Sequence, residues 1–223
     1  GHVVNVTDTD PHARAYRNRS ELSPHSDPGD IVSFLCIRPA PSGGVSRFVS
    51  SLSVFEEIRR ERPELLAVLA RGFRYHRFGE QGPEDDPITP HRIPVFSERD
   101  GLVSSRYVRE YVEIAADEDP SIVLTDIDDE AIRVLEETAN SPGLALDFTM
   151  AAGEAVVANN FTVFHARTAF TDSPEHRRHL LRLWLAADPP RPVVPETRHY
   201  LGEPGIPPQT DRTPSFASRF DSI

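Results

Sequence analysis

Short β-prone runs, each followed by turn-forming residues, recur along this 223-residue chain and constrain its fold more than any other feature. Apolar runs of about four to eight residues are typical of strands, because helices in globular proteins are usually longer. Strands are expected at the following positions: 3–6, 30–37, 45–50, 92–96, 102–108, 144–150, 155–158, 161–164 and 178–186. Many short strands interrupted by helices predict a mainly β fold with helical insertions, built on a double-stranded β-helix (jelly roll) core.

Helices are expected in two places between these strands. Ser53 and Glu56 form a capping-box pattern that opens a helix running to Arg60, and a second helix fits 64–70. We interpret these two helices as packing elements outside the sheets. A third helix is expected over 126–138, with its first residue as the N-cap. Its apolar stripe would consist of Ile127, Ala131, Val134 and Leu135.

For two of these regions the sequence also predicts how the strands are buried or paired. The run 30–37 is apolar almost throughout, which predicts a strand that is buried on both faces. Residues 92–96 and 102–108 are expected to pair as a hairpin, because Asp100-Gly101 between them is a strong turn signal.

Composition and charge argue against several classes of partner. Lys and Arg number 24 against 35 Asp and Glu, and the formal net charge of −11 disfavours binding to nucleic acid. No stretch approaches the roughly 20 apolar residues of a membrane helix, so no membrane association is expected. The single cysteine, Cys36, lies in an apolar run and cannot form an internal disulfide, which favours a reducing, cytoplasmic location.

The length of the chain suits one large domain. Barrels and β-sandwiches of this size commonly remain undivided, so we expect 1–223 to be a single domain. The chain begins without a methionine in a strand-like segment, which suggests that part of the N-terminal region is missing. Prolines recur from residue 188, and 188–223 is expected to be a tail without regular structure. A homo-oligomer is compatible with these features.

His25-Ser26-Asp27 places an imidazole and a carboxylate one residue apart. Side chains at alternate positions of a strand share a face, so the pair could bind one ion at the start or edge of a strand. A distant histidine, His165, could complete a triad of two histidines and one carboxylate, because facing strands bring distant residues together. Such a triad leaves about three positions open on an octahedral ion, which suits non-haem Fe(II) oxygenases rather than a closed zinc site.

Four sequence blocks extend this pattern: 22–27 (LSPHSD), 35–46 (LCIRPAPSGGVS), 159–170 (NNFTVFHARTAF) and 177–185 (RRHLLRLWL). In order and spacing they resemble the TauD/TfdA-like family of Fe(II)- and 2-oxoglutarate-dependent dioxygenases, which includes clavaminate-synthase-like and γ-butyrobetaine-hydroxylase-like enzymes. The resemblance implies Fe(II) as the metal, with 2-oxoglutarate and O2 as cosubstrates.

The resemblance also implies roles for individual residues. His25, Asp27 and His165 correspond to the iron ligands. Arg178 falls where the family places the arginine that grips the far carboxylate of 2-oxoglutarate, a task that suits a guanidinium fork. The adjacent Arg177 leaves a one-residue slip open, because strand alternation lets only one of the two point inward.

Further positions complete the implied site. Ser46 matches a hydroxyl that assists in holding the same carboxylate, where many relatives carry Thr. Arg182 matches a position that can reach an anionic group of the substrate, and it would otherwise be a surface arginine. Glu21 would suit a substrate amino group, and Arg106 could line the entrance unless its strand simply packs. We interpret Arg167, in His-Ala-Arg, as structural.

The implied reaction is hydroxylation of an unactivated C–H bond of a small molecule, such as an amino acid or a natural-product intermediate, with release of succinate and CO2. Desaturation and cyclisation stay open because they use the same ligands. Two other classes also stay open: a non-catalytic metal-binding jelly-roll protein and a zinc-dependent hydrolase on the same triad.

Overall fold

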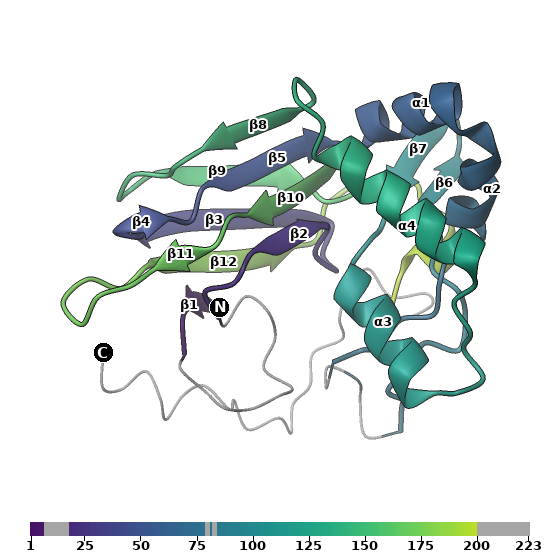
Figure 1. Cartoon of the computed structure of the whole chain (residues 1–223), viewed down its shortest axis with the longest axis horizontal. Coiled ribbons are helices and arrows are strands. Elements are labelled where there is room, and N and C mark those ends of the chain that lie inside the picture. Colours follow the sequence, from purple (N-terminus) through teal and green to yellow (C-terminus); the bar gives the residue numbers. More distant parts are fainter. Residues whose placement is uncertain (7–17, 79–80, 82–83, 200–223) are drawn as a thin grey trace.

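The computed structural model of the chain describes residues 1–6, 18–78, 81 and 84–199. Two four-stranded antiparallel sheets lie against each other, and the helices gather at one end of them, to the right in Figure 1. The fold is thus mainly β with helical insertions, as the sequence predicted. None of the helices in the described part of the chain is long and apolar enough to cross a membrane.

The first sheet contains the longest strands. Its central strand, β3, places Phe34 between Arg182 of one neighbour and Val156 of the other. On the buried face of this sheet, Cys36 and Leu180 pack with Met150 in a small apolar cluster. From edge to edge, the strands are β1 (His2–Val4), β12 (His179–Leu185), β3 (Ile31–Arg38) and β9 (Ala155–Asn159).

The second sheet carries the motif residues. On β10, His165 pairs with His25 on one side and with Phe48 on the other, and Arg167 pairs with Ser46. This register places His25 beside His165, although the two residues lie far apart in the sequence. From edge to edge, the strands are β2 (Leu22–His25), β10 (Val163–Arg167), β5 (Ser46–Ser50) and β8 (Ala145–Phe148).

Two small two-stranded sheets accompany these layers. One pairs β4 (Ser42–Gly43) with β11 (Phe170–Thr171). The other is a hairpin of β6 (Phe96–Arg99) and β7 (Leu102–Ser105). Asp100 and Gly101 form its turn with φ angles of 54° and 75°, the left-handed conformation that Asp-Gly turns favour. The Asp-Gly hairpin is confirmed, but its first strand is Phe96–Arg99 rather than the expected 92–96, and its second strand ends at Ser105 rather than at Val108.

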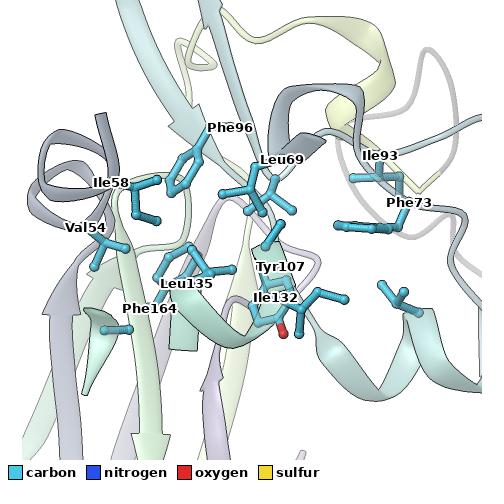
Figure 2. Close-up of a cluster of buried hydrophobic side chains, with 14 of the residues drawn as sticks. Val54, Ile58, Leu69, Phe73, Ile93, Phe96, Tyr107, Ile132, Leu135 and Phe164 are labelled. Atoms are coloured by element: carbon cyan, nitrogen blue, oxygen red, sulfur yellow. The ribbon is translucent and has the colours of Figure 1, made fainter. Parts of the chain in front are cut away.

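The main apolar core lies between the second sheet and the helices. Figure 2 shows Val54, Ile58, Leu69 and Leu135 converging on Phe164 of β10. The burial of these side chains explains why short helices, which are marginal in isolation, form here. The helices are α1 (Ser51–Glu61), α2 (Pro63–Arg71), α3 (Arg109–Glu118) and α4 (Asp126–Ala139).

Helix starts differ from the sequence prediction. Ser50, not Ser53, is the N-cap of α1, and its side chain accepts a hydrogen bond from Ser53 N at 3.2 Å. At α4 the cap is Thr125, because Thr125 and Asp128 satisfy each other's backbone in a capping box.

The apolar stripe of α4 also differs from the prediction. Ile127 was expected on the buried stripe but is 40% exposed, whereas Ile132 is buried with Ala131 and Leu135. The buried residues of α4 are spaced three or four apart and form one inward face: Asp128, Ala131, Ile132, Leu135 and Ala139.

The outer face of the first sheet corrects another prediction. β3 was expected to be buried on both faces, but Leu35 and Ile37 are 36% and 42% exposed. Val157 and Leu183 on the neighbouring strands are exposed as well. No other layer of the described chain covers this face, so β3 buries only the side that faces the second sheet.

Part of the expected tail packs against the body. Val193 is buried, and Arg191 donates hydrogen bonds to Val103 O and Ser104 Oγ, both at 2.9 Å. Pro195–Thr197 forms a turn of 3-10 helix. Residues 188–199 therefore attach to the β6–β7 hairpin, and the rest of the expected tail lies outside the described residues.

Candidate metal centre and its two cavities

Three potential metal ligands meet between the two sheets. One ligand atom from each of His25, Asp27 and His165 lies within 4.8 Å of the other two. The Nε2 atom of His165 is 3.6 Å from Asp27 Oδ2, and the two imidazole centroids are 4.3 Å apart. The structure brings together the three side chains that the sequence proposed as a facial triad.

β2 and the loop after it position the first two ligands. The pair was expected at the start or edge of a strand: His25 is the last residue of β2, an edge strand of the second sheet, and Asp27 lies in the loop after it. Ser26 N donates to Tyr107 O at 2.8 Å, and Tyr107 N donates to Ser26 Oγ at 3.0 Å. These two hydrogen bonds, rather than strand alternation, fix the loop that carries the carboxylate.

Asn160 holds the same loop, a role that sequence reasoning missed. Its side chain is fully buried, with Oδ1 accepting from Asp27 N at 3.3 Å and Nδ2 donating to Gly29 O at 3.0 Å. A buried amide that satisfies two backbone groups rigidifies the segment it bridges. The polar Asn159-Asn160 pair just before an apolar strand was the available signal.

Arg106 corrects the prediction that it lines the entrance. Its side chain is 1% exposed and donates a hydrogen bond to the Asp27 carbonyl. Its guanidinium carbon lies 4.9 Å from the centroid of the Phe161 ring. Arg106 is turned into the protein because backbone carbonyls and an aromatic face receive its charge there, so it supports the metal loop.

β10 presents His165 to the space between the sheets. Phe164 packs into the helix-side core, so alternation sends His165 to the opposite face. Its ring packs against Phe34 and Phe48, with centroids 5.5 and 5.9 Å away. Both ring nitrogens are buried and have no hydrogen-bond partner in the described chain. A buried unpaired nitrogen is costly, which indicates a ligand at this position.

The donor set fits a divalent transition metal. The Nδ1 atom of His25 is 2.8 Å from Ser23 O, which directs the proton to Nδ1 and leaves Nε2 for a metal. Burial and the neighbouring His165 lower the pKa of His25 to about 3, so its ring is neutral at physiological pH. Two imidazoles and one carboxylate, with further positions open, suit Fe(II).

Arg182 neutralises the carboxylate ligand, Asp27. Its Nη1 atom lies 3.0 Å from Asp27 Oδ1, and its guanidinium carbon lies 4.7 Å from the centroid of the Trp184 ring. Burial would raise the pKa of the Asp27 carboxyl, but the attraction of Arg182 and of the two imidazoles outweighs it and lowers that pKa. Asp27 is therefore ionised and ready to bind a cation.

An inner cavity lies between the sheets beside the triad and offers about 40 Å³ to the centres of water-sized molecules. Arg178 and Ser46, the two residues expected to hold the cosubstrate, both line it. Arg178 is 5% exposed, and burial lowers the pKa of its guanidinium. No described residue forms a hydrogen bond with that guanidinium. Arg177 is exposed, so the inward residue of the adjacent pair is Arg178.

An outer cavity of about 400 Å³ opens on the other side of the metal ligands. Its wall includes Glu21, which the sequence proposed, and two carboxylates of α3, Glu110 and Glu113. His25 and Arg182 line both cavities, so the triad stands between them. Sequence reasoning missed α3 and, with it, this wall.

Comparisons with known proteins identify a family and relatives for this chain. A family model described as Taurine catabolism dioxygenase TauD, TfdA family, matches residues 1–184. FR-33289 synthase of Streptomyces rubellomurinus is 27% identical over 176 residues, which cover 77% of this chain and 51% of that protein. A uridine-5'-phosphate dioxygenase of a Streptomyces species is 32% identical over 161 residues, 70% of this chain and 56% of that protein.

Solved structures show a similar fold. An asparagine oxygenase in complex with Fe(II), hydroxyasparagine and succinate has a TM-score of 0.59 at 20% identity, over 82% of this chain and 55% of that one. The non-haem iron oxygenase OrfP in complex with Fe and α-ketoglutaric acid has a TM-score of 0.56 at 12% identity, over 83% and 55%. The chain spans about half the length of the curated relatives it matches.

Proposed function

Because the chain belongs to the TauD/TfdA dioxygenase family, we propose that it is an Fe(II)- and 2-oxoglutarate-dependent oxygenase that hydroxylates an unactivated C–H bond of a small molecule, giving succinate and CO2. The observation that carries this proposal is the position of His25, Asp27 and His165 between a small cavity lined by arginines and a larger cavity. Fe(II), with 2-oxoglutarate and O2, would supply the oxidising power, and the protein would supply binding and orientation.

Each cavity would hold one reactant. In the inner cavity, Arg178 and Ser46 would bind the far carboxylate of 2-oxoglutarate, because an anion would complement the buried guanidinium of Arg178. The opposite end of the molecule would then face the metal ligands. Apolar side chains line the rest of the space and would keep water from it: Phe34, Phe48, Met150, Val156 and Leu180.

The substrate would bind in the outer cavity, whose volume suits an amino acid or a natural-product intermediate of similar size. Glu21 could accept hydrogen bonds from a substrate amino group. Arg182 reaches the same cavity and could bind an anionic group once a metal shares the charge of Asp27. Screening candidate small molecules by mass spectrometry for a gain of one oxygen would identify the substrate and would separate hydroxylation from desaturation or cyclisation.

A metal-binding protein without redox chemistry is the main alternative. It would need the triad but would have no use for the buried Arg178, and this residue favours the oxygenase. The same paired sheets around a metal site support a double-stranded β-helix as the topology. A cytoplasmic location, suggested by the lone Cys36, stays a prediction, as does any homo-oligomer.

The experiment adds 2-oxoglutarate to anaerobic Fe(II)-loaded protein and follows the weak visible charge-transfer band of the chelate. We expect the wild type to give the band and Arg178→Gln to need at least about tenfold more 2-oxoglutarate, because a charge-assisted hydrogen bond is lost. Arg177→Gln is the matched control on the exposed neighbour and should behave as the wild type. A folded wild-type protein that gives no band would contradict the proposed function.

A further inference from the structure

A second buried guanidinium lies in the inner cavity. Arg167, which the sequence suggested was structural, is 5% exposed. Its Nη2 atom donates to the carbonyls of Ser20 and Asn18. Its Nε and Nη1 atoms are also buried but have no hydrogen-bond partner in the described chain. A purely structural role accounts for Nη2 and leaves the other two donors unexplained.

The strand register directs Arg167 toward the proposed cosubstrate. Arg167 follows His165 by two residues on β10, so both side chains lie on the same face. It also pairs directly across the sheet with Ser46 of β5. The guanidinium carbons of Arg167 and Arg178 lie 4.7 and 5.2 Å from the centroid of the Phe170 ring, and both residues line the inner cavity.

The charges around the cavity are not balanced. Among the described residues its wall contains three arginines and no carboxylate, and of these arginines only Arg182 forms an ion pair, with Asp27. Asp172 is the acidic neighbour of the other two, and its Oδ1 atom already accepts from Arg178 N at 2.8 Å. Burial and the charge of Arg178 lower the pKa of Arg167 to about 10, so it stays charged at neutral pH. Arg167 and Arg178 carry two positive charges against the single negative charge of Asp172, so a further anion would balance the charge of the cavity.

We propose that Arg167 is a second cationic binding residue for the cosubstrate, donating a hydrogen bond from Nη1 to the far carboxylate that Arg178 and Ser46 also hold. This inference rests on the proposed function, because it takes 2-oxoglutarate as the occupant of the inner cavity. Arg167 would also connect that carboxylate to the backbone of Ser20, the residue before Glu21 in the wall of the outer cavity.

The test compares two 2-oxo acids that differ only at the far end. 2-Oxoglutarate carries the far carboxylate, whereas 2-oxopentanoate has a methyl group in its place. Both are titrated into anaerobic Fe(II)-loaded wild type, Arg167→Gln, Arg167→Lys and the control Arg177→Gln, with the charge-transfer band as the readout. We expect Arg167→Gln to weaken 2-oxoglutarate about tenfold or more and to change 2-oxopentanoate less than twofold, with Arg167→Lys between it and the wild type.

Equal weakening of both acids would overturn the inference, because it would assign Arg167 a structural role only. Unchanged binding of both would overturn it as well. These outcomes differ from failure of the proposed function, in which the wild type itself gives no band with 2-oxoglutarate. A crystal structure of the wild type with Mn(II) and N-oxalylglycine does not depend on the variants folding. Arg167 Nη1 should lie within hydrogen-bond distance of the far carboxylate, and a carboxylate held by Arg178 and Ser46 alone would contradict this.

Discussion

The Nη1 atom of Arg182 lies 3.0 Å from Asp27 Oδ1 and 3.2 Å from Asp27 Oδ2, so one cation faces both oxygens of the carboxylate ligand. The two side chains are 12% and 6% exposed, which makes this a largely buried ion pair. A metal bound by Asp27 would share that carboxylate with Arg182. Arg182 lines both cavities, so the pair lies where the two cavities meet.

Breaking this pair should destabilise the metal-free protein. Asp27→Asn leaves the guanidinium buried without its counter-charge, and we expect a loss of about 3 kcal/mol in the free energy of unfolding. The double variant Asp27→Asn/Arg182→Met removes both charges and should recover most of that loss. Urea denaturation in the presence of a chelator measures both values. Additive effects of the two substitutions would show that the pair contributes no coupling energy.

The pH dependence of the metal-free protein should depend on His25. Its pKa is lowered to about 3 in the folded chain, first by burial and then by His165, whereas the unfolded chain has the ordinary value of 6.5. Below pH 6.5 the unfolded state therefore binds the extra proton, so this contribution to stability is present above pH 6.5 and is lost as pH falls toward 3.

The effect can reach about 1.4 kcal/mol per pH unit for one proton. We expect the unfolding free energy of the wild type to fall more steeply between pH 6.5 and 5 than that of His25→Gln. Urea denaturation of the two chelator-treated proteins at matched pH values measures the difference. Parallel curves would mean that His25 is protonated equally in both states.

The sequence was most informative where a motif encodes chemistry locally. His25 and Asp27 are one residue apart, and their partner His165 lies in a block with its own signature, so the triad could be predicted before its geometry was known. The choice of Arg178 over Arg177 needed the direction of one strand, and alternation alone could not say which side faced inward. The inward side of the strand is the one that faces the second sheet, and only the folded structure shows which side that is.

Other elements lack such local signals. α3 has no side-chain cap, since its N-cap is Val108, and its buried face of Tyr111, Val112 and Ala115 is interrupted by acidic residues. Nothing before Arg109 therefore marks a helix start. Asn160 depends on Gly29, which is 131 residues away along the chain, so its role follows from tertiary packing that no local pattern encodes.

Arg106 also acts on a residue that is distant in the sequence. Its substitution tests whether it supports the loop that carries Asp27 rather than lining the substrate entrance. Its guanidinium donates to the carbonyl of Asp27, so Arg106→Met would leave that carbonyl unsatisfied and loosen the loop that holds the metal ligand. We expect a loss of about 2 kcal/mol in unfolding free energy, together with weaker binding of Fe(II) or of Co(II) as its spectroscopic substitute. Arg106→Lys should restore only part of both, because Lys lacks the planar fork.

Arg99→Met is the control, since Arg99 lies on the hairpin just before Arg106 and is half-exposed. It should leave Co(II) affinity unchanged. If Arg106 lined the substrate entrance instead, Arg106→Met would change the KM for substrate while unfolding free energy and Co(II) affinity stayed at wild-type values. The two readouts therefore separate a residue that supports the metal loop from one that contacts substrate, because only the first acts on the protein before any substrate is present.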